Sequence, residues 1–159
     1  MKKEKSNSGP SLIDTAFAYY YYRVERLVRM HFSQLMIELG EDISIEQWIL
    51  INRLAETGSS PQSELVDKTF KDRPNVTRLL DGLEKRNLVE RIDDPGDRRK
   101  FEIRLTKDGR ALLDRMVPKI KKERAVVYDG LGKKDLDSLK KISEKIEENI
   151  LHSKVGKRK

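Results

Sequence analysis

Apolar residues recur at every third or fourth position between Ile13 and Leu39. This spacing predicts one long amphipathic helix, with Ser11 as its N-cap and Gly40 as its stop signal. At roughly 28 residues the helix would be more than twice the mean helix length, so we expect it to reach a partner subunit or to bridge two parts of the fold. Its expected apolar stripe consists of Ile13, Phe17, Tyr20, Val24, Leu27, His31, Leu35 and Leu39.

Two further helices are predicted between residues 44 and 70. The first has Ser44 as N-cap, Gln47 completing a capping box and Gly58 as its end. The second is short, with Ser60 as N-cap and Pro61 at the first helical position. The buried stripe expected on the first of them is Trp48, Ile51, Leu54 and Ala55.

A fourth helix is predicted from Pro74 to Asn87, preceded by Asp72 or Arg73. Its apolar positions, which we expect to face inward, are Val76, Leu79, Leu80 and Leu83. The positions left for its exposed side are Asn75, Thr77, Arg78, Asp81 and Arg86.

The hydrophobic period then changes from helical to alternating. Residues 89–92 and 101–105 are predicted strands, joined through a type II turn at residues 94–97 with Pro95 and Gly96 in its centre. Two strands alone are marginal in water, so the hairpin must pack on helices. We expect it to do so through Phe101, Ile103 and Leu105.

Two long helices complete the expected fold. Thr106 is the predicted N-cap of the first, Pro118 is expected to kink it, and Gly130 and Gly132 mark its end. Its apolar seam is Leu113, Met116, Ile120, Arg124, Val127 and Leu131, and that of the last helix is Leu136, Leu139, Ile142, Ile146 and Ile150.

These elements predict a mainly α fold with a small β-hairpin, in which a winged helix-turn-helix core is flanked by long dimerisation helices. The expected domains are a disordered tail (1–10), an N-terminal dimerisation helix (11–43), the winged helix-turn-helix (44–105), C-terminal dimerisation helices (106–152) and a basic tail (153–159). The terminal helices have apolar seams but no core of their own. A homodimer would bury these seams, and a monomer whose long helices cover one another is the alternative.

Charge and composition narrow the class of protein. The net charge of +7 is carried largely by residues 1–5 (+2) and 154–159 (+4), so placement of charge matters more than its total. The chain has no cysteine and only two histidines, and it has no nucleophile motif, phosphate loop or metal-ligand spacing. We therefore expect neither an enzyme nor a cofactor or metal site. Because no membrane span or secretory signal is evident, we expect a soluble, cytoplasmic protein.

The predicted helix-turn-helix and hairpin indicate a DNA-binding protein. The second helix of such a pair enters the major groove, where arginine pairs with guanine and asparagine with adenine. The hairpin carries a basic tip at residues 98–100, and a narrow minor groove attracts inserted arginine. Because side chains alternate along an extended segment, Asp97 would hold Arg99 in position. The alternative is a solvated hairpin, or a winged helix used only for protein contacts.

Residues 44–109 resemble the MarR family of bacterial transcription regulators. The resemblance rests on "DRRKFEIRLTKDG", which contains the wing pattern Asp97, Arg99, Leu105, Thr106 and Gly109, and on "VTRLLDGLEKRNLVER" before it. Asn87 departs from the glycine often found there, but asparagine tolerates the left-handed conformation. The resemblance implies a homodimeric repressor or activator on a pseudo-palindromic operator, with Arg78 in the major groove and Arg99 at the minor groove. The candidate DNA-binding residues are Ser60, Gln62, Arg73, Asn75, Thr77, Arg78, Asp97, Arg98, Arg99 and Lys100.

Members of this family commonly respond to small aromatic or anionic ligands. The candidate ligand-binding residues here are Tyr20, Arg23, His31 and Trp48. Plain core and interface packing is the other interpretation of the same side chains.

Overall fold

The computed structural model describes residues 16–69, 72–93 and 101–153. The chain divides into two compact units, Met1–Leu113 and Asp114–Lys159. The first unit holds helix α2 (Phe17–Glu38), helix α3 (Ile45–Thr57), helix α4 (Gln62–Thr69), helix α5 (Arg73–Lys85) and a small sheet. Helix α6 (Lys107–Val127) begins in the first unit and ends in the second, which also holds α7 (Lys133–His152).

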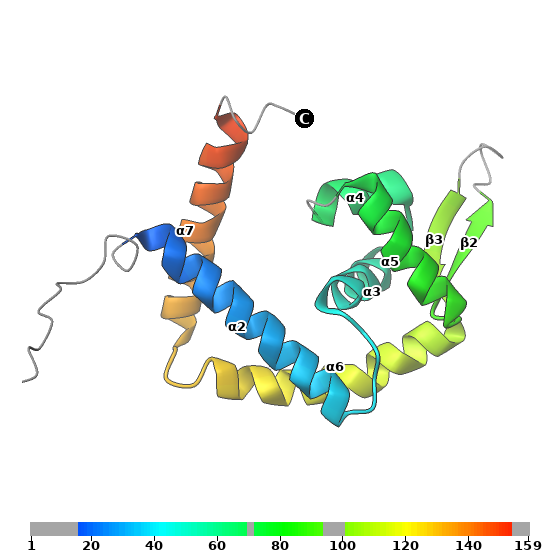
Figure 1. Cartoon of the computed structure of the whole chain (residues 1–159), viewed down its shortest axis with the longest axis horizontal. Coiled ribbons are helices and arrows are strands. Elements are labelled where there is room, and N and C mark those ends of the chain that lie inside the picture. Colours follow the sequence, from blue (N-terminus) through cyan, green and yellow to red (C-terminus); the bar gives the residue numbers. More distant parts are fainter. Residues whose placement is uncertain (1–15, 70–71, 94–100, 154–159) are drawn as a thin grey trace, which may run out of the picture. The chain divides into compact units, whose positions relative to one another are not determined.

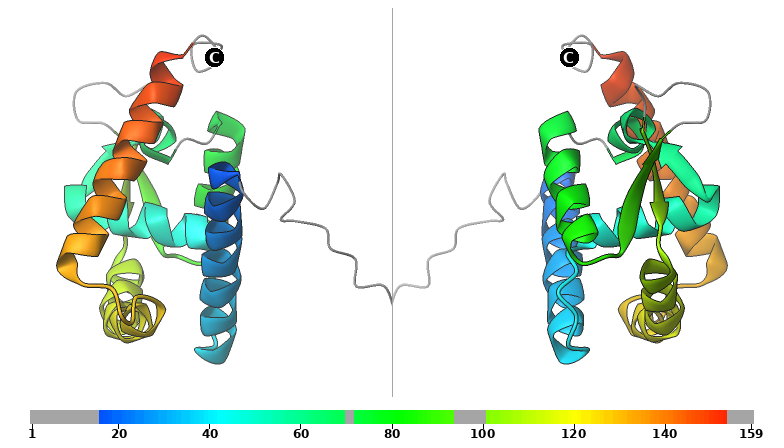
Figure 2. Two further views of the ribbon diagram at one scale, coloured as in Figure 1. Left: turned by 90° about the vertical axis from the view of Figure 1, so that its left-hand side faces the viewer. Right: turned by 90° about the vertical axis from the view of Figure 1, so that its right-hand side faces the viewer.

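The sheet is antiparallel and has three strands in the order β1-β3-β2. Strands β2 (Val89–Asp93) and β3 (Phe101–Leu105) lie side by side as the predicted hairpin (Figures 1 and 2). Strand β1 (Ser59–Pro61) pairs with the other edge of β3. The predicted fold class, mainly helical with a small β-hairpin, is therefore confirmed, and the sheet has one strand more than we expected.

The core of the first unit lies between α3, α4, α5 and the sheet. These helices pack against one another and α3 packs on β3 (Figure 1). The side chains that fill this core are almost completely buried: Leu50, Ile51, Leu54, Leu65, Val76, Leu80, Leu83 and Ile103. On α3, Leu50 belongs to this set, whereas the predicted Trp48 and Ala55 are only half-buried, as is Leu79 on α5.

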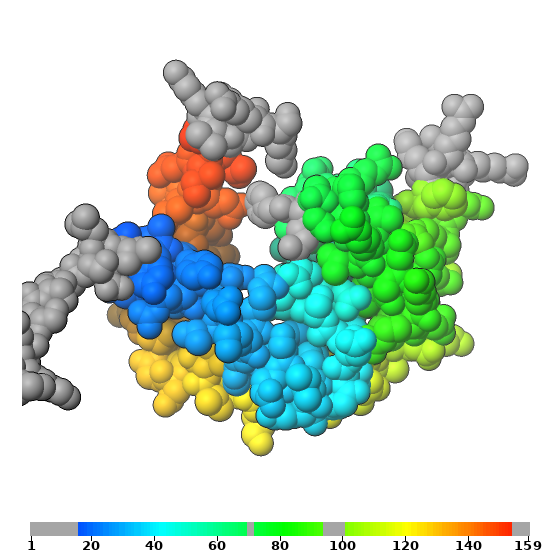
Figure 3. Space-filling model, in the orientation of Figure 1, coloured from blue at the N-terminus to red at the C-terminus, as the bar shows by residue number. Residues whose placement is uncertain are grey.

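The long N-terminal helix differs from the prediction. It begins at Phe17 after Ala16 and ends at Glu38, while the expected cap Ser11 lies outside the described residues. The first half of its predicted stripe is exposed, with exposed fractions of 50–62% for Phe17, Tyr20, Val24 and Leu27. Only its C-terminal end is buried, through Phe32, Leu35 and Met36. Helix α2, coloured blue to cyan, lies at the surface in the space-filling view (Figure 3).

Two shorter segments also differ. Ser60 and Pro61 belong to strand β1 instead of opening a helix, and α4 begins at Gln62. Pairing of Ser60 with Ile103 across the sheet extends this segment in preference to a helical turn. On β3 the side chains of Ile103 and Leu105 are buried as expected, but Phe101 is 52% exposed.

In the second unit, α7 has no buried residue and its seam is open. Leu139, Ile142 and Ile150 are 48%, 49% and 57% exposed. Val127 and Leu131, at the end of the predicted seam before α7, are also exposed. Pro118 lies inside α6, and the helix continues past it to Val127.

Candidate nucleic-acid interface

Helix α5 is firmly defined at its start. Asp72 is the N-cap, and its carboxylate accepts hydrogen bonds from the backbone N–H of Asn75 at 2.8 Å and from the Asn75 side-chain amide at 2.8 Å. Pro74 occupies the first turn, where it costs no backbone hydrogen bond. With Val76, Leu80 and Leu83 buried, the opposite face of α5 exposes Arg73, Asn75 and Arg78 to solvent.

A hydrogen-bond chain joins α4 to α5 beside this exposed face. The side-chain amide of Gln62 donates to the hydroxyl of Thr77 at 2.6 Å, and that hydroxyl donates to the backbone carbonyl of Arg73 at 2.9 Å. Both Gln62 and Thr77 are half-buried. The structure thus brings together three of the predicted DNA-binding residues.

Ser60 does not belong with them. Its side chain is 1% exposed and its hydroxyl donates to Glu64 at 2.9 Å, so it has no surface to offer to DNA. The Glu64 carboxylate accepts hydrogen bonds from Lys68 and from Ser60, which together hold its pKa below the ordinary value. We therefore remove Ser60 from the candidate contacts and assign it to packing between β1 and α4.

The base of the wing is held to α5 by an arginine that sequence reasoning missed. Arg91 on β2 donates to Asp81 at 2.6 Å and also to Glu84, both of which lie on α5. Across the hairpin, Arg104 donates to Glu90 at 2.7 Å. These ion pairs join residues of different elements, so no short stretch of sequence indicates them, and they were not predicted. Residues 94–100, which include the predicted turn at 94–97 and the predicted basic tip at 98–100, lie outside the described residues.

The Leu-Thr-x-x-Gly end of the wing pattern has a structural explanation. The hydroxyl of Thr106 donates to the backbone carbonyl of Asn87 at 2.6 Å and accepts from the backbone N–H of Gly109 at 3.0 Å, so Thr106 caps α6 as predicted. Asn87 has a φ of 57°, in agreement with the expected left-handed conformation. Thr106 therefore joins the end of α5, the wing and the start of α6.

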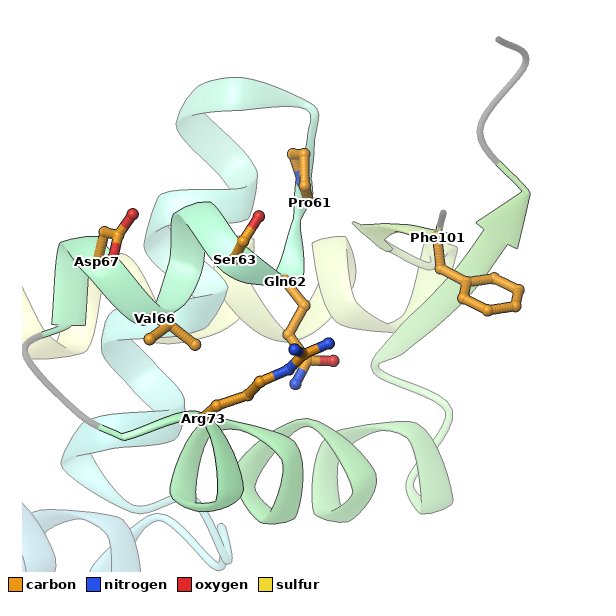
Figure 4. Close-up of a pocket in the computed structure, with 7 residues that line it drawn as sticks. All are labelled: Pro61, Gln62, Ser63, Val66, Asp67, Arg73 and Phe101. Atoms are coloured by element: carbon orange, nitrogen blue, oxygen red, sulfur yellow. The ribbon is translucent and has the colours of Figure 1, made fainter. Parts of the chain in front are cut away.

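Two open hollows lie in the winged helix-turn-helix. One, of about 350 Å³, is lined by Glu46, Gln47, Asn75, Arg78 and Leu79. The other, of about 370 Å³, lies between the start of α4, the start of α5 and β3 (Figure 4). It is lined by Pro61, Gln62, Ser63, Val66, Asp67, Arg73 and Phe101.

The four candidate ligand-binding residues are not brought together in one hollow. Tyr20 and His31 share a face of α2, but eleven residues separate them, or about 16 Å along a helix that rises 1.5 Å per residue. The guanidinium of Arg23 lies 5.7 Å from the ring centre of Tyr19, and Trp48 is half-buried on α3. Neither hollow described above includes any of these four side chains.

The described residues form neither a metal site nor a membrane-spanning helix. Within residues 16–69, 72–93 and 101–153, no cluster of three or more acidic or histidine side chains is arranged to hold a metal ion. Among the helices of these ranges, none combines the length and the hydrophobicity that a bilayer span requires.

Comparison with known proteins identifies relatives of this fold. The model of the MarR family matches residues 41–100. An uncharacterised HTH-type transcriptional regulator of Bacillus subtilis, YhbI, is 34% identical over 102 residues, which are 64% of this chain and 66% of YhbI. The HTH-type transcriptional repressor NicR of Pseudomonas putida is 40% identical over 72 residues, 45% of this chain and 46% of NicR. The matches thus span just under two thirds and under half of these relatives.

Solved structures extend the likeness over most of the chain. The repressor CouR bound to a 23-mer DNA duplex has a TM-score of 0.77 and 25% identity, covering 87% of this chain and 99% of CouR. BpsR of Bordetella bronchiseptica, whose DNA binding is regulated by 6-hydroxynicotinic acid, has a TM-score of 0.77 and 24% identity, covering 87% and 98%. The second likeness bears on the fold alone.

Proposed function

This chain belongs to the MarR family of transcription regulators, and from that premise we propose that it is a homodimeric repressor that binds a pseudo-palindromic operator in double-stranded DNA and responds to a small effector. The observation that carries the proposal is the exposed face of α5, which presents Arg73, Asn75 and Arg78 over a buried apolar face. Two guanidinium groups and an amide on one face match the donors and acceptors of the major groove.

The proposed wing contact rests on the sequence and on the base of the hairpin. Strands β2 and β3 pair with each other on either side of residues 94–100, and Arg91 ties β2 to α5. We assign Arg98, Arg99 and Lys100 to the minor groove or its phosphates, with Asp97 positioning Arg99. Residues that contact phosphate give affinity and register, whereas those on α5 give sequence preference.

The homodimer is supported by apolar side chains that a single chain leaves exposed. On α2 these are Phe17, Tyr20, Val24 and Leu27, and on α7 they are Leu139, Ile142 and Ile150. Such rows of apolar residues mark interaction surfaces, and an isologous interface is the simplest way to bury a row in a chain of one kind. A monomer is the less favoured alternative because these rows stay open in it.

An effector site is the third part of the proposal. Because Tyr20, Arg23, His31 and Trp48 form no single hollow within one chain, we propose that any effector site near them is completed by the second copy. A small aromatic acid is the class of compound to test first, by analogy with the regulation of BpsR by 6-hydroxynicotinic acid.

Selection of bound sites from random duplex DNA tests the proposal. We expect an enriched palindromic site whose affinity falls with salt at a log–log slope of about −0.9 for each phosphate neutralised. The half-sites should lie about one helical turn apart, roughly 34–36 Å. Failure to enrich any site would favour the alternative, a winged helix used for protein contacts.

A further inference from the structure

The amide group of Gln62 has a fixed orientation that follows from counting hydrogens. The Thr77 hydroxyl has a single hydrogen, which it donates to the carbonyl of Arg73 at 2.9 Å. The same hydroxyl oxygen, 2.6 Å from Nε2 of Gln62, must therefore accept from the amide. The Gln62 side chain thus uses one of its two N–H hydrogens inside the protein.

The rest of that amide group is left for a ligand. Among the residues that the structure describes, none donates a hydrogen bond to Oε1 of Gln62, and none pairs with the guanidinium of Arg73. Gln62 and Arg73 both line the hollow at the start of α4 and the start of α5 (Figure 4). The site therefore offers the Oε1 acceptor and one N–H donor of the Gln62 amide. The exposed guanidinium of Arg73 lines the same hollow.

We propose that Gln62 reads an adenine in the major groove, and that Thr77 is the positioning residue that holds its amide for this contact. Adenine presents an N6–H donor and an N7 acceptor in that groove, and the two remaining groups of the Gln62 amide complement them in a bidentate pair. This inference rests on the proposed function and adds to it a base-reading residue on α4, outside the recognition helix.

The hydrogen bond from Gln62 to Thr77 could orient the amide for base recognition, or it could only join α4 to α5. A held amide loses little side-chain freedom on binding, which is the advantage of a preorganised contact. If the hydrogen bond only joined α4 to α5, its loss would lower stability without changing which bases are preferred. Specificity and stability must therefore be measured on the same variants.

The experiment uses the operator obtained by selection and the full-length protein. Each adenine of one half-site is replaced in turn by 7-deaza-adenine, which lacks the N7 acceptor. We expect one position to weaken wild-type binding by about 2- to 13-fold, because the analogue keeps its N6–H donor and loses one of the two hydrogen bonds of the pair. The same substitution should have no effect on Gln62→Ala, because that variant no longer makes the contact.

Variants of Thr77 supply the matched control. Thr77→Val has nearly the same shape but no hydroxyl, and we expect it to lose most of the discrimination between adenine and 7-deaza-adenine. Thr77→Ser retains the hydroxyl and should restore it. If thermal unfolding shows that Thr77→Val does not fold, the comparison of wild type with Gln62→Ala still tests whether Gln62 contacts the adenine.

The outcomes separate this inference from the function on which it rests. If wild-type protein shows no preference for the selected site over random DNA, the proposed function fails. If it shows that preference but tolerates 7-deaza-adenine at every position, or if Gln62→Ala remains equally sensitive to it, the assignment of Gln62 is overturned while the proposed function stands.

Discussion

Gly109 lies at the close approach between helix α6 and the segment that leads from α5 into the wing. A Cβ atom built on Gly109 would lie 2.0 Å from the backbone carbonyl oxygen of Leu88, which is far inside van der Waals contact. That carbonyl also accepts a hydrogen bond from the backbone N–H of Thr106 at 3.2 Å, so it is not free to move aside. The glycine of the wing pattern is therefore explained by packing, without any unusual backbone conformation.

We predict that Gly109→Ala destabilises the fold by about 2–4 kcal/mol, because backbone must shift to admit the methyl group. Urea unfolding measures the effect. Arg110→Ala, at the next and exposed position of the same helix, is the control and should change the free energy of unfolding by less than about 0.5 kcal/mol. Equal stability of the two variants would show that α6 can move away from Leu88.

For Arg78 on α5, the proposed role in base recognition can be tested without changing the stability of the fold. Arg78 is exposed, and Leu80 and Val76 keep α5 packed without it. We predict that Arg78→Ala leaves stability unchanged but lowers discrimination between operator and random DNA by about 1–3 kcal/mol. Competition binding with both DNAs measures this difference, and an unchanged affinity ratio would remove Arg78 from the base-reading set.

At the scale of elements, an ion pair ties α2 to the start of α3. Arg29 on α2 binds Glu46 in the first turn of α3 and Glu25 on its own helix. Burial of the Glu46 carboxyl raises its pKa, but hydrogen bonds from its own backbone N–H and from Arg29 lower it by more, so its pKa lies below the ordinary value. A carboxyl group of this kind stabilises the fold when it is ionised.

We predict that Glu46→Gln is less stable than wild type near neutral pH, by no more than about 1 kcal/mol because Arg29 is 44% exposed. Since the folded pKa is depressed, the stabilisation is present above the ordinary pKa of glutamate and is lost as the pH falls through the folded pKa. The stability difference should therefore close on acidification. Glu147→Gln, at an exposed position of α7, controls for net charge, and a difference that does not vary with pH would contradict the assignment.

Elements whose ends carry local signals were predictable from the sequence. Ser44 and Thr106 were identified as caps, and both make the expected hydrogen bonds to the backbone. Strand β1 was not predicted, because a three-residue strand depends on its pairing with β3, more than forty positions away. The pairing of Gln62 with Thr77 and the ion pairs of Arg91 were missed for the same reason: they join side chains of separate elements.

At the scale of the whole molecule, the hydrophobic periodicity of the sequence identified the apolar faces of the helices. It did not show which part of the same chain, or of a second chain, packs against those faces. The stripe of α2 was expected to be buried, yet its first half is exposed, and α7 buries none of its residues. A helical period shows that one face is apolar, and it is equally satisfied by a core or by a second subunit. The exposed faces thus connect the fold to the proposed dimer, which would also place two recognition helices on one duplex.

The dimer leads to a prediction that joins assembly to DNA binding. Ile142 is 49% exposed on the apolar face of α7, and a charge placed there would be buried and unpaired in an interface that includes this face. We predict that Ile142→Glu shifts the protein from dimer to monomer in sedimentation experiments, and that operator affinity falls by at least tenfold because each monomer reads only one half-site. Lys140→Gln makes the same change in net charge on the opposite side of α7 and should leave both properties unchanged. A dimeric Ile142→Glu would place the interface elsewhere, with the exposed stripe of α2 as the next surface to change.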